Sequence, residues 1–409
     1  MTHNGLNTFQ GITAMVTTMM GSGVIMLPSA FGDVGYVFGT LQFVSTSIIS
    51  FFTLYAISSA AVKMNKNEKQ TYYSVCKNIN KFMAVFADLC IALQGYSCCL
   101  VYMIALATWI PKLIGKEISR FYMVMIFLPP LYYLASLKNL KNLRYVSFLS
   151  VGSVTYLASL ILYYSLLTRG KYSEGEKVNF NYKFNSALSV IIFALGCHQN
   201  IIKVYSELQN KSLKNITLIS GLSVLFGSSI YLVIGFFGYF IAGSSIDGSI
   251  LDSFLDKSTK LSRFLIQDTF DKFMILNKIA VICFCCVMMS AFPTQQQPAK
   301  DSVINLIFLI TKKPRNESSE DTMRKILTFI FCITVGILAC IPDLDFDSVL
   351  KFIGATAATS ITYIIPSLVY IFTNHYYGFL RVSAIVVAII STLLMIYMVI
   401  FNFTEDDKS

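Results

Sequence analysis

Charged residues are scarce in this chain. Asp, Glu, Lys and Arg make up 13% of its 409 residues and hydrophobic residues make up 55%, whereas about 25% of an ordinary soluble protein is charged. The shortfall runs along the whole length, and the longest polar stretches lie near 244–271 and 311–325. The composition therefore predicts a polytopic membrane protein and argues against a receptor with a ligand-binding ectodomain.

Signatures of several other classes are also missing. No glycine-rich loop followed by Lys is present, which argues against a pump with a nucleotide site. The apolar runs contain only isolated His, Asp, Glu and Ser, so we expect no enzyme, no cofactor and no bound metal. The net charge of +10 is divided among short loops, so we expect no nucleic-acid partner. The 10 cysteines lie mostly in apolar runs, where Cys behaves as a small hydrophobe.

Eleven apolar runs are candidates to cross a bilayer, which takes about 20 apolar residues. They lie near 7–31, 36–62, 82–110, 121–137, 145–168, 186–205, 216–243, 272–296, 326–342, 347–372 and 380–402. The first run is too long for a cleavable signal and lacks a basic start. With a cytoplasmic N-terminus, the inner loops hold 18 Lys and Arg and the outer segments hold 13, the bias that membrane proteins have. We predict an all-α protein with this orientation, in a plasma, vacuolar or other endomembrane.

The first run is interrupted near its middle. Gly21, Ser22 and Gly23 follow one another there, and Pro28 comes soon after. Lipid cannot satisfy freed backbone groups, so unwound backbone at membrane depth lines a cavity. Freed N–H groups at the start of a half-helix favour an anion, and freed carbonyls at an end favour a cation. The alternative is a glycine kink or a packing contact between helices.

The sixth run has a similar interruption at Gly196 and Cys197, followed by His198. Transporters built from inverted repeats have a broken helix at the corresponding position of each half. The first and sixth runs would each open a half of five helices, which favours a transporter over a simple kink. His198 is the one histidine of three inside a run. Histidine titrates near neutral pH and suits a proton carrier; a neutral histidine bonded to a neighbouring carbonyl is the alternative.

Four stretches, in order along the chain, resemble the amino acid/auxin permease family. This family includes the sodium-coupled neutral amino acid transporters and the vacuolar amino acid transporters of fungi. The stretches are Gly-Ser-Gly-Val-Ile-Met-Leu-Pro at 21–28, Phe193 to His198 with Tyr205 to Leu208, Phe292 to Lys300, and Phe352 to Thr356 with Ile365 and Pro366. Each is weak alone, but together they cover nearly the whole chain.

The resemblance implies a LeuT-like fold and secondary transport of an amino acid by alternating access. We expect one transporter domain over 1–409, made of five-helix repeats at 7–168 and 186–372 and an eleventh helix at 380–402. The partners would be the lipid bilayer and a neutral or cationic amino acid, with no obligate protein partner. A proton gradient, or the gradient of the substrate itself, would drive transport.

The resemblance also implies a binding site between the two interruptions. The carboxylate of the substrate would meet N–H groups of the first interruption, at Gly21, Ser22, Gly23 and Val24. Its amino group would meet carbonyls of the second, around Phe193, Leu195 and Gly196. The side chain would point toward residues of the third and tenth runs, namely Cys98, Cys99, Tyr102, Thr356 and Thr359.

The residues expected to couple transport to an ion depart from the family pattern. Thr17 stands where sodium-coupled relatives have Asn, and Ser290 is the nearest hydroxyl to the Thr that those relatives have in the eighth run. We therefore expect H⁺ ahead of Na⁺ as the coupling ion. Asp88 is a further candidate beside His198, because an intramembrane carboxylate is by default a functional candidate; its depth also allows a plain interfacial position.

Two rival functions remain open at this point. The same fold could carry another small metabolite or an ion. A membrane sensor could bind an amino acid in the same site without flux, and it would need a cytoplasmic partner surface, which the 300–325 loop offers.

Overall fold

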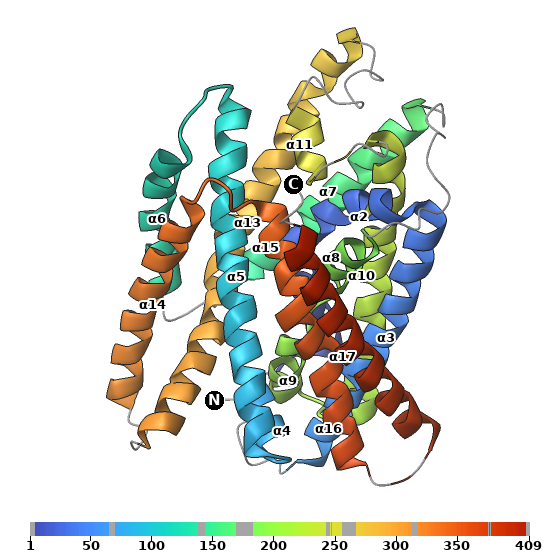
Figure 1. Ribbon diagram of the computed structural model, residues 1–409, viewed down its shortest axis with the longest axis vertical. Helices are drawn as coiled ribbons and strands as arrows, with labels where there is room; N and C mark the ends of the chain where they lie inside the picture. The colour runs from blue at the N-terminus through green and yellow to red at the C-terminus, as the bar shows by residue number, and fades with distance from the viewer. Residues whose placement is uncertain are drawn as a thin grey trace.

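The computed structural model describes residues 5–64, 70–137, 144–168, 183–242, 246, 248–255, 267–312, 317–374, 376 and 378–405. Apart from one backbone pairing between Leu6 and Leu208, the regular structure in these ranges is helical (Figure 1). Nine helices of the described part are long and apolar enough to cross a membrane, and one bent pair makes a tenth. The predicted all-α polytopic membrane protein is confirmed.

The first predicted run is the bent pair. Helix α1 (Thr8–Met19) begins at Asn7, whose side chain accepts from the Gln10 N–H in a capping box. After Gly21, a 3₁₀ turn η1 (Ser22–Met26) leads into α2 (Leu27–Val34), and the two halves meet at 48°. Pro28 lies in the first turn of α2, where proline is tolerated because N–H groups there have no helical acceptor. The predicted interruption is therefore a real break.

The next four runs form one helix each, close to the predicted bounds. They are α3 (Tyr36–Lys63), α5 (Lys81–Ile114), α6 (Arg120–Ser136) and α7 (Arg144–Thr168), with the short α4 (Tyr72–Lys77) between α3 and α5. Helix α6 has 17 residues, which is at the lower limit for crossing a bilayer.

The sixth run is broken as well. Helix α8 (Phe184–Ala194) ends before Leu195 and Gly196, and α9 (His198–Glu207) begins after Cys197. The seventh run is α10 (Leu213–Ala242), followed by the short α11 (Ile250–Leu255).

The eighth run is the longest helix and extends well beyond its predicted end at 296. Helix α13 (Gln267–Thr311) contains Pro293 and Pro298 and continues through a polar stretch. Gln296 and Lys300 in this stretch are buried, at 0% and 4% exposed, because the neighbouring helices α5, α6 and α14 (Glu317–Ala339) cover them. Protein rather than lipid surrounds these polar groups, so the helix needs no apolar sequence there.

The tenth run has a wide helical turn at its centre. Helix α15 (Phe346–Ile353) passes through π-helical turns η3 (Gly354–Ala358) and η4 (Ser360–Ile364) into α16 (Ile365–Thr373). The Tyr72 hydroxyl, from α4, donates to the Ile361 carbonyl at 2.9 Å. Burial raises the pKa of Tyr72, so its hydroxyl stays a donor. Helix α17 (Phe379–Glu405) ends the described chain.

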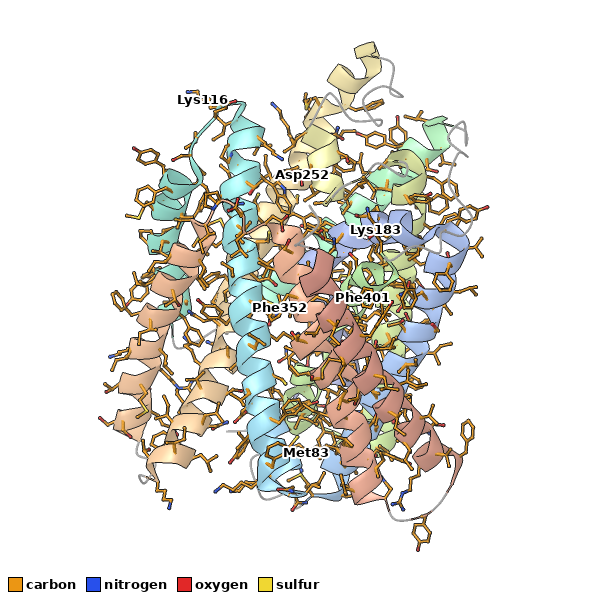
Figure 2. All side chains as sticks on the ribbon, viewed as in Figure 1. Met83, Lys116, Lys183, Asp252, Phe352 and Phe401 are labelled. Atoms are coloured by element: carbon orange, nitrogen blue, oxygen red, sulfur yellow. The ribbon has the colours of Figure 1, made fainter. Side chains whose placement is uncertain are left out.

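Helices α5 and α13 lie next to each other in the interior of the molecule. A Cβ on Gly95 would lie 2.6 Å from the Gln295 carbonyl oxygen, so glycine permits this close approach. Helices α6 and α14 lie on one side of them, and the broken helices with α3, α10 and α17 lie on the other (Figure 1). Lys116, Asp252 and Lys183 lie toward one end of the molecule, opposite Met83 (Figure 2). The division into repeats at 7–168 and 186–372 stays a prediction.

Candidate functional site

The first break presents backbone groups to the interior. Gly21 is extended, with φ −125° and ψ −157°, and its N–H is turned back to the Met19 carbonyl at 2.8 Å. The helical segment Ser22–Val34 begins directly after it. The first N–H groups of a helix have no acceptor within the helix, so those of Ser22 and Gly23 are available. The Ser22 hydroxyl is also buried and has no hydrogen-bond partner among the described residues.

The second break lies against the first. A Cβ on Gly23 would lie 2.8 Å from Ala194 Cα and 2.9 Å from Phe193 Cδ1, so only glycine fits there without displacing α8. The Gly196 N–H donates to the Phe193 carbonyl at 3.1 Å, and the last carbonyls of a helix have no donor within the helix. The start of one half-helix and the end of another thus meet at one place, as the sequence predicts.

Helix α5 covers both breaks. A Cβ on Gly21 would lie 3.7 Å from the Tyr102 hydroxyl, and a Cβ on Gly196 would lie 3.7 Å from Gln94 Nε2. Tyr102, a predicted substrate residue, is therefore at the first break. Cys98 and Cys99 are buried between these two residues, and the Cys99 thiol donates to the Phe292 carbonyl of α13 at 3.5 Å.

Two further side chains support the first break, and sequence reasoning missed both. The Tyr231 hydroxyl of α10 donates to the Met19 carbonyl at 2.5 Å, and the Asn200 amide of α9 donates to the Thr18 hydroxyl at 3.2 Å. Tyr231 thus satisfies a carbonyl at the end of α1, where the last carbonyls have no helical donor, and Asn200 ties α9 to the side chain of Thr18. Their spacing in sequence gives no signal, because each acts on a helix far away in the chain.

The two residues predicted in the tenth run, Thr359 and Thr356, both donate to carbonyls of their own helix. The Thr359 hydroxyl is buried and donates to the Gly354 carbonyl at 2.6 Å within the π-helical turn. The Thr356 hydroxyl donates to the Phe352 carbonyl at 2.7 Å. Ser360, one turn beyond Thr356, contacts Met395 of α17. The turn that holds Thr356 packs on α8 and α5 as well as on α17, and the role of Thr356 stays a prediction.

The two hydroxyls at the positions where sodium-coupled relatives have Asn and Thr donate to their own helices. Thr17 donates to the Thr13 carbonyl at 2.8 Å, and Ser290 donates to the Cys286 and Val287 carbonyls at 2.8 and 2.9 Å. No contact among the described residues joins the two side chains. Their roles in coupling stay predictions.

His198 lies at the start of α9 and is fully buried. Its Nε2 lies 3.0 Å from the Thr53 hydroxyl of α3. That hydroxyl donates to the Ile49 and Ser50 carbonyls, so Nε2 is the donor to it and Nδ1 carries the lone pair. No partner for Nδ1 lies within the described residues. The Ser50 hydroxyl lies 3.1 Å from that of Tyr363, which extends the polar contacts to the tenth run.

Asp88 is buried near the start of α5, away from the breaks. The Ser302 hydroxyl of α13 donates to its Oδ1 at 3.0 Å. This carboxylate is 1% exposed, and its role in coupling stays a prediction.

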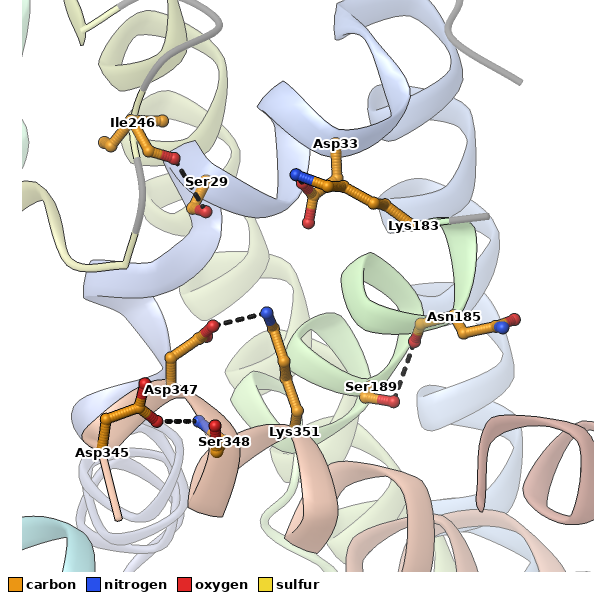
Figure 3. Close-up of polar contacts among 10 residues, drawn as sticks. All are labelled: Ser29, Asp33, Lys183, Asn185, Ser189, Ile246, Asp345, Asp347, Ser348 and Lys351. Carbon is orange, nitrogen blue, oxygen red and sulfur yellow. Dashed lines mark hydrogen bonds and ion pairs between the residues drawn. The ribbon is translucent and has the colours of Figure 1, made fainter. Parts of the chain in front are cut away.

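Charged side chains lie at the ends of the broken helices that are far from the breaks. Asp33, near the end of α2, lies 3.7 Å from Lys183, which precedes α8. Lys351 and Asp347 pair within α15, in the same region of the molecule (Figure 3). The ion pair between Asp33 and Lys183 thus joins the two broken helices at this end. Groups of three or more His, Cys, Asp or Glu that could hold a metal are absent from the described residues.

The comparisons with known proteins agree with this arrangement. Residues 4–404 match the model of the family "Transmembrane amino acid transporter protein". Vacuolar amino acid transporter 5 of Schizosaccharomyces pombe is 25% identical over 378 residues, which cover 90% of this chain and 84% of that protein.

Two solved structures have the same fold. A manganese transporter of Eremococcus coleocola is similar with a TM-score of 0.64 and 12% identity, over 94% of this chain and 84% of that one. MhsT in complex with L-phenylalanine is similar with a TM-score of 0.57 and 13% identity, over 96% of this chain and 98% of that one. Both are LeuT-fold transporters. This chain, matched almost from end to end, is therefore a LeuT-fold member of the transmembrane amino acid transporter family.

Proposed function

We propose that the protein carries an α-amino acid across a membrane by alternating access, with the substrate bound between the two breaks. The observation that supports this most is the close contact of Gly23 with Ala194. This contact brings a helix start and a helix end to the same place. The positive end of one helix dipole and the negative end of the other then face one small volume.

An α-amino acid matches that pair of helix ends. Its carboxylate would accept from the N–H groups of Ser22 and Gly23, and its ammonium would donate to carbonyls near Phe193 and Gly196. Hydrogen bonds to charged groups contribute about 1.5–3 kcal/mol each. The Ser22 hydroxyl, which is buried without a partner among the described residues, would complete the carboxylate site.

We further propose H⁺, or the substrate gradient alone, as the driving force. His198 is buried beside the second break with Nδ1 unpaired within the described residues, which suits a group that takes up a proton when the cavity opens. Asp88 is the second candidate. Na⁺ is less favoured, because Thr17 and Ser290 replace the side chains of sodium-coupled relatives and both donate to their own helices. The protein would lie in the plasma membrane or a vacuolar membrane. Its N-terminus would face the cytoplasm.

The test is uptake of labelled amino acids into proteoliposomes that hold the purified protein. A sodium gradient, a proton gradient and no gradient are compared. Accumulation under the proton gradient alone supports H⁺ coupling, whereas equal uptake in all three supports a uniporter or exchanger.

Two glycine variants make this test specific to the site. Gly21→Leu places a side chain 3.7 Å or less from the Tyr102 hydroxyl and should abolish uptake. Gly152→Leu on α7 adds the same side chain where nothing lies within 4 Å, so its uptake should equal that of wild type. Binding of amino acids without any uptake would instead favour the sensor. If the protein neither binds nor takes up amino acids, the proposed substrate class is refuted.

A further inference from the structure

One face of α5 runs across both breaks. Gln94, Cys98 and Tyr102 are spaced four residues apart, so they lie on the same face of the helix. Tyr102 is at the first break and Gln94 is at the second, each 3.7 Å from the position of a Cβ on the facing glycine. This face therefore covers the volume where the two helix ends meet.

The Gln94 amide is in an unusual state for a buried group. The residue is 5% exposed, and its Oε1 has no hydrogen-bond partner among the described residues. Buried polar atoms in proteins are nearly always paired, because an unpaired one carries its full desolvation cost. The Nε2 atom of this amide lies near the second break and its Oε1 is unpaired among the described residues, which is consistent with a partner that arrives with the substrate.

The residues described at the two breaks carry no formal charge. They are Gly21, Ser22, Gly23, Tyr102, Phe193, Ala194 and Gly196. A substrate side chain with a full charge would lose its hydration there without a counter-ion, which is costly. A neutral side chain with a hydroxyl or an amide would have a much smaller desolvation cost at this place.

We infer that Gln94 is a specificity-determining residue, whose amide binds the polar group of a neutral substrate side chain at the second break. This rests on the proposed function, since the breaks must hold the α-amino and α-carboxyl groups. An amide both donates and accepts hydrogen bonds, so it complements another amide or a hydroxyl. It cannot neutralise a cationic side chain.

The experiment compares uptake of three labelled substrates, L-glutamine, L-leucine and L-lysine, by the same proteoliposomes. The ratios of their initial rates do not depend on how much protein is folded. Gln94→Leu should lower the rate for L-glutamine relative to L-leucine by about tenfold or more, because the polar group loses its partner. Gln94→Glu should raise L-lysine relative to L-glutamine by about tenfold, because a carboxylate replaces the amide in nearly the same volume.

Gln296→Leu is the matched control. Gln296 is equally buried and also has an unpaired Oε1 within the described residues, but it donates to the Cys332 thiol of α14, on the side away from the breaks. Its substrate ratios should equal those of wild type.

Unchanged ratios in both Gln94 variants, with wild-type uptake intact, would overturn the role of Gln94 and leave the proposed function standing. Uniform loss of all three substrates in Gln94→Glu and Gln94→Leu would assign Gln94 to structure alone. A wild-type protein that carries and binds none of the three would remove both proposals.

Discussion

Single glycines determine how closely the two breaks can approach. Gly23 is the most constrained of them, because an added Cβ would lie 2.8 Å from the backbone Cα of Ala194 and 2.9 Å from the ring of Phe193. A Cβ on Gly196 would lie 3.1 Å from the Phe193 carbonyl oxygen, and one on Gly21 would meet its nearest atom, the Tyr102 hydroxyl, at 3.7 Å. The three positions therefore have different sensitivities to the same substitution.

Replacing Gly23 by Ala should weaken the binding of the substrate. The added Cβ would lie 2.8 Å from Ala194 Cα, so the two breaks must separate. Loss of one charge-assisted hydrogen bond to the substrate, at about 1.5–3 kcal/mol, lowers affinity about tenfold or more. The measurement is the Kd for a labelled amino acid on purified protein.

Gly32→Ala serves as the control for this prediction. It lies in the same helical segment, and its added Cβ would meet its nearest neighbour at 3.6 Å, an ordinary contact. Equal affinities for Gly23→Ala, Gly32→Ala and wild type would show that the contact between the breaks does not position the substrate.

At this scale the sequence predicts some residues of the site and misses others, for a physical reason. Gly21, Gly23 and Gly196 interrupt apolar runs, and an interruption is visible in sequence. Gln94 and Tyr231 matter through the helix that they face, and apolar runs of nearly uniform hydrophobicity do not reveal which face of a helix is directed inward. Thr356 has the right residue type, but its hydroxyl donates to the Phe352 carbonyl of its own helix.

Among the helices, α13 departs most from its prediction. Its C-terminal half carries Gln296 and Lys300, which the sequence analysis placed at the end of a run and in a loop but which are buried between helices. Lys300 Nζ donates to the Ala135 carbonyl of α6 at 3.1 Å and to the Thr328 hydroxyl of α14 at 2.8 Å. One side chain thus joins three helices, and it satisfies a carbonyl at the end of α6.

Removal of the Thr328 hydroxyl should weaken the contact among these three helices. Thr328→Val keeps the shape of the side chain but leaves the buried amino group of Lys300 with one acceptor fewer. We expect a loss of stability of about 1–3 kcal/mol, with substrate ratios unchanged because the breaks are not involved. Thermal unfolding in detergent measures the change.

Thr322→Val on the same helix is the comparison. The Thr322 hydroxyl is exposed and donates only to the Ser318 carbonyl of its own helix, so the melting temperature should stay within error of wild type. Equal melting temperatures for the two variants would mean that the bond from Lys300 contributes little.

At the scale of the whole molecule, contacts join the two broken helices at both ends of the molecule. At each end, the start of one broken helix contacts the end of the other. Asp33 and Lys183 do so at one end (Figure 3). At the other, the segment before α1 pairs with the segment after α9: the Leu6 N–H donates to the Glu207 carbonyl at 2.7 Å, and the Gln209 N–H donates to the Leu6 carbonyl at 3.0 Å. Neither contact could be predicted from sequence, because both depend on how the two halves pack.

The pairing at Leu6 should keep the inner parts of α1 and α9 together during transport. Leu6→Pro removes the donor to Glu207, whereas Leu6→Ala keeps the backbone pairing and removes only the side chain. In Leu6→Pro we expect faster hydrogen exchange at the Gln209 amide and a slower initial rate of uptake. The Kd should change little, because the pairing lies at the opposite end of α1 from the break.

Leu6→Ala should behave as wild type in exchange and uptake. If both variants lose uptake equally, the side chain rather than the backbone pairing couples the helices. If Leu6→Pro exchanges faster and transports normally, α1 and α9 move independently.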